Sequence, residues 1–121
     1  MAKSILVVED NELNLKLFRE LLQAHGHATE GLRDGREVID HVRRNRPDLI
    51  IMDIQLPHIS GLDIIRMLKA DTDLKSIPVL AVTAFAGAGD HERIRDEGAE
   101  DCISKPITVA RFIETVQRLI G

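Results

Sequence analysis

The sequence contains neither tryptophan nor tyrosine, and its phenylalanines are Phe18, Phe85 and Phe112. Proteins that bind single-stranded nucleic acids stack bases on aromatic side chains, so this composition argues against such a platform. A net charge of −4 also opposes general attraction to a phosphate backbone. A local basic cluster is interpreted as a solvated helix face, and it consists of Arg36, Arg43, Arg44 and Arg46. We therefore expect no nucleic-acid partner.

Cysteine occurs once, and long hydrophobic runs are missing. Cys102 cannot form an internal disulfide, and no histidine accompanies it at metal-ligand spacing. No apolar run approaches the roughly 18 residues of a transmembrane helix, and no basic-then-apolar leader follows Met1. We therefore expect no membrane insertion and a cytoplasmic location. The 121 residues, 44% apolar and 30% charged, suit one compact domain over 1–121 with no output domain.

Short apolar runs that end on polar residues are the main pattern along the chain. Residues 49–52 are all apolar and run into Asp53, which is typical of a central parallel strand with both faces buried. Residues 4–8 form a similar run that ends on Glu9 and Asp10. The strands that we expect span residues 4–8, 27–31, 48–53, 77–83 and 100–104. The strand at 27–31 is placed at a sheet edge because it is polar.

Segments with helical periodicity separate these strands. Ser60, with Asp63 three residues later, is predicted to cap one helix, and Thr108 is predicted to cap the last. The helices that we expect begin after Asn11, span 35–45, begin after Ser60, span 90–97 and begin after Thr108. Parallel strands need such crossovers, so the alternation predicts an α/β fold with a doubly wound parallel sheet.

The sequence leaves the exposure of two leucines open, and it predicts that one segment is mobile. Leu13 and Leu15 lie roughly 100° to either side of the apolar stripe of the first helix. Either both pack on flanking strands, or at least one is exposed near the acidic edge. Residues 84–89 have little to hold them in one shape, and the following helix has Ile94 as its only large apolar residue. We expect this loop and helix to be the mobile part of the domain.

Polar residues gather where the predicted strands end, and they are Glu9, Asp10, Asp53, Thr83 and Lys105. Ligands of open α/β sheets bind beyond the carboxyl ends of the strands, so these side chains are expected to share a crevice. Crowded carboxylates repel one another unless their pKa values rise or a cation joins them. An all-oxygen set with few carboxylates suits Mg²⁺, with Mn²⁺ as a substitute. An aspartate can be a nucleophile toward a phosphoryl group. The hydroxyl of Thr83 and the ammonium of Lys105 are suitable groups to bind the phosphoryl oxygens.

The same residues carry a family resemblance. The chain resembles, over its whole length, the receiver domain of bacterial two-component response regulators. The motifs that carry the resemblance are Glu9-Asp10, Asp53 with Pro57 and Gly61 behind it, Thr83-Ala84 and Lys105-Pro106. It implies a flavodoxin-like (βα)5 fold whose five-stranded parallel sheet has the order 2-1-3-4-5.

The resemblance also implies roles for the acidic residues. Asp53 would accept a phosphoryl group from a histidine on a sensor kinase or a histidine phosphotransfer protein. Mg²⁺ would be held by Asp10, Asp53 and the backbone carbonyl of Gln55. Glu9 would reach the ion through water, and it stands where the family more often has Asp.

For the remaining site residues, the resemblance implies a response to phosphorylation. Thr83 would move to the phosphoryl group, Lys105 would pair with it, and the Lys105–Pro106 bond would be cis. A downstream protein partner would read the face built by residues 84–121. Cys102 departs from the family, because most members carry an aromatic ring there that changes rotamer on activation. We hypothesise that the coupling runs instead through Thr83 and the adjoining loop, with Phe85 changing its packing.

A narrower resemblance, carried by residues 8–14, 52–57 and 83–86, is to single-domain regulators of the DivK type, which take part in cell-cycle and cell-division control. The favoured function is therefore a signalling module that is not an enzyme beyond slow self-catalysed phosphorylation and dephosphorylation. A Mg²⁺-dependent phosphohydrolase with Asp53 as nucleophile is the alternative, but such enzymes usually need a second carboxylate where Gln55 stands. A flavin-binding protein is disfavoured by the lack of a phosphate-gripping loop and of Trp or Tyr.

Overall fold

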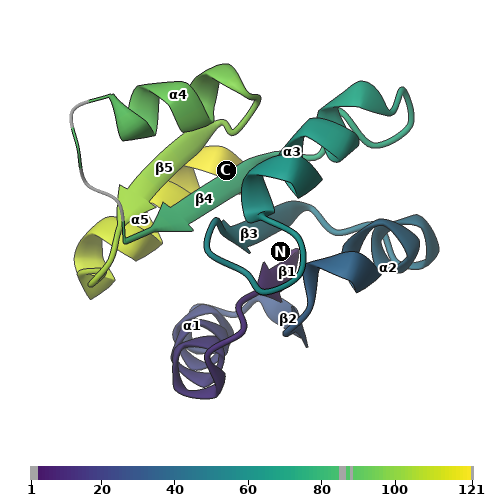
Figure 1. The fold of residues 1–121 in the computed structure, drawn as a ribbon. Helices are drawn as coiled ribbons and strands as arrows, with labels where there is room; N and C mark the ends of the chain where they lie inside the picture. The colour runs from purple at the N-terminus through teal and green to yellow at the C-terminus, as the bar shows by residue number, and fades with distance from the viewer. Residues whose placement is uncertain (1–2, 85–86, 88, 121) are drawn as a thin grey trace.

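A computed structural model describes residues 3–84, 87 and 89–120 of the chain. Strands and helices alternate along it in the order β1 (Ser4–Val8), α1 (Glu12–Ala24), β2 (Ala28–Leu32), the short 3-10 helix η1 (Gly35–Glu37), α2 (Val38–Arg44), β3 (Leu49–Asp53), α3 (Gly61–Ala70), β4 (Val79–Thr83), α4 (Asp90–Asp96), β5 (Asp101–Ser104) and α5 (Val109–Ile120). Within the described residues the strands form a five-stranded parallel sheet in the order β2-β1-β3-β4-β5 (Figure 1). The predicted doubly wound, flavodoxin-like architecture is confirmed.

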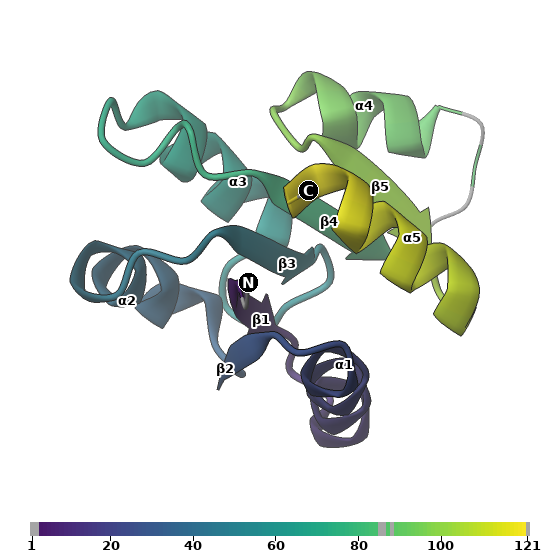
Figure 2. The same cartoon turned by 180° about the vertical axis from the view of Figure 1, so that it is seen from behind.

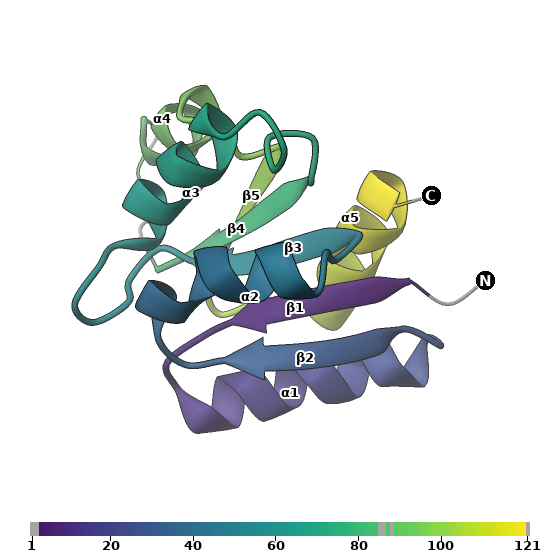
Figure 3. The same ribbon diagram turned by 90° about the vertical axis from the view of Figure 1, so that its right-hand side faces the viewer.

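Helices cover both faces of the sheet, which explains why the central strands are apolar without interruption. Successive side chains of β1 point to opposite faces, so Ile5 belongs to the core cluster shared with α1 and α5, whereas Leu6 belongs to the cluster shared with α2, α3 and α4. Figures 2 and 3 show these two groups of helices on opposite faces of the sheet. On the first face the rings of Phe18 and Phe112 stack with their centroids 5.3 Å apart, which joins α1 to α5.

The register of the strands aligns their carboxyl ends at one edge of the sheet. Val8 of β1 pairs with Met52 of β3, so the residues that follow them, Glu9 and Asp53, are neighbours. Asp53 in turn pairs with Val82 of β4. We call this polar edge of the sheet, beyond the ends of β1, β3 and β4, the crevice.

The helices lie where the sequence predicted them, but some of their bounds, capping bonds and buried residues differ from the prediction. The predicted helix over 35–45 begins as η1 and continues as α2, and the edge strand lies one residue later than predicted. Ser60 caps α3 as expected, but its Oγ accepts the backbone N–H of Leu62 at 3.1 Å. Ile64 joins the buried face of α3.

Leu13 and Leu15 have different surroundings in α1. Leu13 is 78% exposed, whereas Leu15 packs against the core beneath α1. At about 100° per residue, Leu13 lies about 140° around the helix from the buried Phe18, and Leu15 lies about 60° from it. The expectation that both pack on flanking strands is therefore wrong for Leu13.

The loop after β4 and the helix that follows it were predicted to be mobile, and Phe85 was predicted to change its packing in that loop. Phe85, Ala86 and Ala88 lie outside the described residues. Both predictions stay predictions.

Candidate functional site

The acidic side chains predicted to converge do so beyond β1 and β3. Carboxylate oxygens of Glu9, Asp10 and Asp53 all lie within 4.8 Å of one another. Glu9 is 1% exposed and Asp53 is 2% exposed, while Asp10 is partly buried. Buried carboxylates are costly unless a cation or hydrogen-bond donors accompany them.

Lys105 supplies a cation to this cluster from beyond the end of β5. Its Nζ donates to Glu9 at 3.1 and 3.0 Å and to Asp53 Oδ2 at 3.1 Å. Burial disfavours the ammonium, but the hydrogen bonds to Glu9 and the charge of Asp53 outweigh it, so the pKa of Lys105 is raised. Burial raises the pKa of Glu9, and the hydrogen bond from Lys105 opposes this shift without cancelling it. The Lys105–Pro106 bond is cis, as expected.

Backbone groups fix the orientation of the carboxylates. The N–H of Gln55 donates to Asp53 Oδ1 at 3.1 Å, and the N–H of Asn11 donates to Glu9 Oε1 at 3.3 Å. Asp53 is therefore held through one oxygen by the loop after β3 and through the other by Lys105.

Thr83 and Gln55 border the same crevice. Thr83 ends β4 with a fully buried side chain, and its carbonyl accepts the backbone N–H of Lys105 at 2.8 Å. The side-chain oxygen of Gln55 accepts the N–H of Ala84 at 2.9 Å, which links the loop after β3 to the residue after Thr83. The metal-ligand role expected for the Gln55 carbonyl stays a prediction.

Gly61, one of the residues that carried the family resemblance, lies directly behind Asp53. A Cβ at this position would lie 2.1 Å from the backbone oxygen of Asp53 and 2.8 Å from Cα of Ile54. The N–H of Gly61 also donates to the carbonyl of Ile54 at 3.0 Å. The missing side chain allows α3 to start against the backbone of the central strand, which sets the position of Asp53.

Arg33 takes part in the site although its sequence environment did not indicate it. The guanidinium of Arg33, just after β2, donates to the backbone carbonyl of Asp10 at 3.2 and 3.1 Å. The partners are 23 residues apart, so neither periodicity nor a local motif could have revealed this bond.

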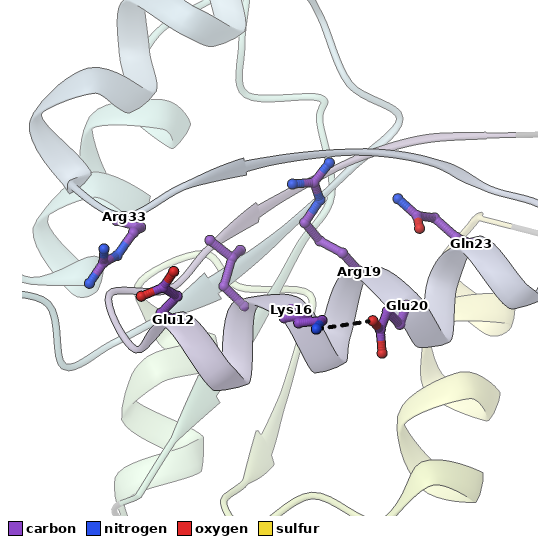
Figure 4. Close-up of a pocket in the computed structure, with 7 residues that line it drawn as sticks. Glu12, Lys16, Arg19, Glu20, Gln23 and Arg33 are labelled. Atoms are coloured by element: carbon purple, nitrogen blue, oxygen red, sulfur yellow. Dashed lines mark ion pairs between the residues drawn. The ribbon is translucent and has the colours of Figure 1, made fainter.

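Arg33 also borders an open groove of about 460 Å³ between α1 and β2 (Figure 4). The other residues that line the groove are Glu12, Leu15, Lys16, Arg19, Glu20 and Gln23. Its cations have partners within the chain, because Lys16 pairs with Glu20 and Arg19 bonds to Thr29. The groove is therefore a less suitable site for a phosphorylated group than the crevice at the strand ends.

Cys102 lies in the core on the face covered by α4. It is 1% exposed, and burial raises the pKa of its thiol to about 11. The thiol is therefore neutral at physiological pH. A small, neutral and buried group cannot move between core and solvent as a ring would.

The donor set at the strand ends fits a hard divalent cation. Its closely spaced ligand atoms are carboxylate oxygens, which Mg²⁺ prefers, and they come with a net negative charge even after Lys105 is counted. A doubly wound parallel sheet with such a cluster, an aspartate at the end of its central strand and a lysine beyond its last strand defines the receiver class of signalling domains.

The chain belongs to the response regulator receiver domain family, whose model matches residues 5–117. Within this family it is similar to the polar-differentiation response regulator DivK of Brucella anthropi. The two sequences are 58% identical over 121 residues, which cover 100% of this chain and 98% of that protein. The same regulator of Brucella ovis is 57% identical over the same shares.

Solved structures show the same architecture. The receiver domain of a histidine kinase from Syntrophus aciditrophicus matches with a TM-score of 0.91 and 36% identity, over 98% of this chain and 90% of that one. The receiver domain of sensor histidine kinase PA1611 from Pseudomonas aeruginosa matches with a TM-score of 0.90 and 32% identity, over 100% and 99% of the chains. That domain carries a magnesium ion coordinated in its active-site cleft. In the part of this chain that is described, no helix combines the length and hydropathy of a membrane span.

Proposed function

We propose that the chain is a phosphoaccepting response regulator, in which Asp53 receives a phosphoryl group from a histidine of a sensor kinase or a phosphotransfer protein. The observation that carries the proposal is the Asp53 carboxylate, which is buried at the end of β3, contacts Lys105 and lies within an acidic cluster. A carboxylate can serve as a nucleophile that forms an acyl phosphate.

The phosphoryl transfer needs no reactant other than the donor histidine and Asp53. A carboxylate oxygen of Asp53 forms a bond to phosphorus while the bond between phosphorus and the donor histidine nitrogen breaks, and that nitrogen keeps the electron pair. Charge on the phosphoryl oxygens must be matched in the site. Lys105 is already within 3.1 Å of Asp53 and is assigned this role. Thr83 is assigned a hydrogen bond to another oxygen.

Mg²⁺ is the metal that we assign to the acidic cluster, with Mn²⁺ as a substitute. Asp10, Asp53 and the backbone carbonyl of Gln55 would hold it, and Glu9 would reach it through water. The ion would offset the negative charge that the carboxylates present to an incoming phosphoryl group. The carboxylate of Glu9 is buried and already hydrogen-bonded to Lys105, so we assign it an indirect role at the metal site.

The surface beside the crevice supports docking of a protein phosphodonor. Leu13 is 78% and Leu17 43% exposed on α1. Leu17 also borders a hollow of about 420 Å³ that Lys105, Pro106 and Ile107 line from the other side. Exposed apolar residues beside a reactive group are typical of a protein-binding surface.

The output that we propose is binding rather than catalysis. Residues 1–121 would act as a receiver domain, with slow self-catalysed phosphorylation and dephosphorylation. A downstream protein would read the face built by residues 84–121, because phosphorylation shifts a two-state equilibrium that a partner can sense. The likeness to a polar-differentiation regulator supports a role in cell-cycle or cell-division control. The cytoplasmic location stays a prediction.

The phosphohydrolase alternative needs an acid or base next to Asp53. Gln55 has a neutral amide there, and its oxygen is engaged with the N–H of Ala84. The signalling function is therefore favoured by this contact.

The proposal is tested with acetyl phosphate and Mg²⁺. The parent should gain the mass of one phosphoryl group per chain, and Asp53→Asn should gain none, because the substitution keeps the shape and removes the nucleophile. Asp63→Asn, at an exposed aspartate of α3, is the matched control and should label like the parent. Undiminished labelling of Asp53→Asn would overturn the assignment, and rapid steady turnover would support the phosphohydrolase.

A further inference from the structure

His91 of α4 and Ser104 at the end of β5 form a hydrogen bond that none of the roles described above uses. Ser104 Oγ and His91 Nε2 lie 2.9 Å apart, and both residues are partly buried. The ring nitrogen donates or accepts according to its tautomer. The bond joins the first turn of α4 to the strand on which that helix lies (Figure 1).

Ser104 adjoins the crevice through two connections. It pairs with Thr83 in the register of β4 and β5, and the next residue in the chain is Lys105. Lys105 donates its backbone N–H to Thr83 and its ammonium to the buried carboxylates. A displacement of Lys105 therefore reaches Ser104 through a single peptide bond.

The helix at the other end of the bond is lightly held. α4 has seven residues, of which Ile94 is the buried one, and Gly89 provides no side-chain cap. Its far end is fastened to α3 by bonds of 2.6 and 3.1 Å from Arg66 to Glu97. Elements with few buried contacts open and shift most easily. The end of α4 nearer the crevice is therefore the end that a single hydrogen bond can control.

Phosphorylation changes what Lys105 must contact. A phosphoryl group on Asp53 carries more charge than the carboxylate and extends farther from the strand. The Lys105 ammonium, which bridges Asp53 and Glu9 in the resting protein, must therefore form a new ion pair with the phosphoryl group. A conformational equilibrium shifts only if some contact differs between the two states. Cys102, small and buried, is not suited to supply that difference.

We propose that His91 is a positioning residue that couples the crevice to α4. The His91–Ser104 hydrogen bond holds the first turn of α4 on β5 in the resting protein, and it is lost when Lys105 pairs with a phosphoryl group on Asp53. The inference rests on the proposed function and adds the contact through which the face read by a partner responds.

The test measures amide hydrogen exchange of the α4 segment, residues 90–97, with and without acetyl phosphate and Mg²⁺. Allosteric couplings are typically about fivefold or more, so exchange in the parent should rise by about that factor on phosphorylation. In His91→Ala and in Ser104→Ala, exchange should already be high in the resting protein and should change little on phosphorylation. The double variant should show the same exchange as either single variant, because each substitution removes the same hydrogen bond.

Two further variants separate this role from general support of α4. His91→Gln should recover a low resting exchange and the response, because its amide can bond to the Ser104 hydroxyl. Glu92→Ala, at the exposed neighbouring position of the same turn, should behave like the parent.

Mass spectrometry of the same samples separates the two proposals. Mass gain in every variant together with a parent-like response in His91→Ala and Ser104→Ala would overturn the coupling alone. Effects that add in the double variant would overturn it as well. No mass gain in the parent would overturn the proposed function and the coupling with it.

Discussion

Substitution of Asp10 by Asn should stabilise the protein when no divalent cation is present. Carboxylate oxygens of Asp10 lie within 4.8 Å of those of Glu9 and Asp53. Two unit charges about 5 Å apart repel by about 3 kcal/mol at an effective dielectric constant of about 20. Asp10 takes part in two such pairs, but it is partly exposed and Lys105 offsets part of the repulsion. We expect Asp10→Asn to raise the free energy of unfolding by about 1–3 kcal/mol after this discount.

The measurement is urea unfolding at pH 7 in the presence of a chelator, followed by circular dichroism. Asp63→Asn serves as the control for a change of the same kind at an exposed site. With Mg²⁺ at a hundred times its dissociation constant, the parent should gain about 2.7 kcal/mol. Asp10→Asn should gain less, because it has lost a charged ligand. The difference in free energy of unfolding between Asp10→Asn and the parent should therefore become smaller or change sign when Mg²⁺ is added.

The pH dependence follows from the raised pKa of Glu9. Because burial raises this pKa above its ordinary value of 4.5, the folded state binds the proton more tightly than the unfolded state does. The stability that Glu9 contributes is therefore present in full below about pH 4.5 and is lost as the pH rises through the raised pKa. The advantage of Asp10→Asn should shrink on acidification. An unchanged free energy of unfolding at pH 7 without divalent cations would refute the repulsion argument.

Three further outcomes are expected. Leu13→Gln should slow phosphotransfer from a histidine kinase but not labelling by acetyl phosphate, and it should leave stability within about 0.5 kcal/mol; Met67→Gln on α3 is the control, and equal transfer rates would show that Leu13 does not contact the donor. Gly61→Ala should lower the free energy of unfolding by about 3 kcal/mol, because the new methyl group meets the backbone of Asp53; an unchanged urea midpoint would contradict this contact. The thiol of Cys102, with a pKa of about 11, should react with a thiol reagent only as fast as the protein opens; rapid reaction in native buffer would show that it is accessible.

The fold was predictable because its central strands are buried on both faces. Such strands are continuous apolar runs, and the residue that ends each run marks an edge of the sheet. Asp53 could therefore be placed beside Glu9 before any contact was known. The predicted starts of β3, β4 and β5 are one or two residues early, but each of these strands ends where it was predicted to end. The polar edge strand β2 has no such run and is shifted by one residue at both ends.

Contacts between side chains far apart in the sequence could not be predicted in the same way. The bonds from Arg33 to the Asp10 carbonyl and from Arg66 to Glu97 depend on how far each side chain reaches across neighbouring elements. The exposure of Leu13 depends on the rotation of α1 about its axis, which the packing of Phe18 and Leu22 decides. Composition and periodicity contain little information on either quantity.

The contact between Lys105 and Glu9 joins residues that are 96 positions apart. During synthesis the carboxylates beyond β1 and β3 leave the ribosome long before their cation does. A chain that has folded only its first strands therefore has the acidic cluster without the group that balances it. Closing so long a loop requires the later strands to be in place, because the entropy of closure is offset only by their packing. In the function proposed here, a phosphorylated aspartate would then report that the chain has been made and folded at least as far as Lys105.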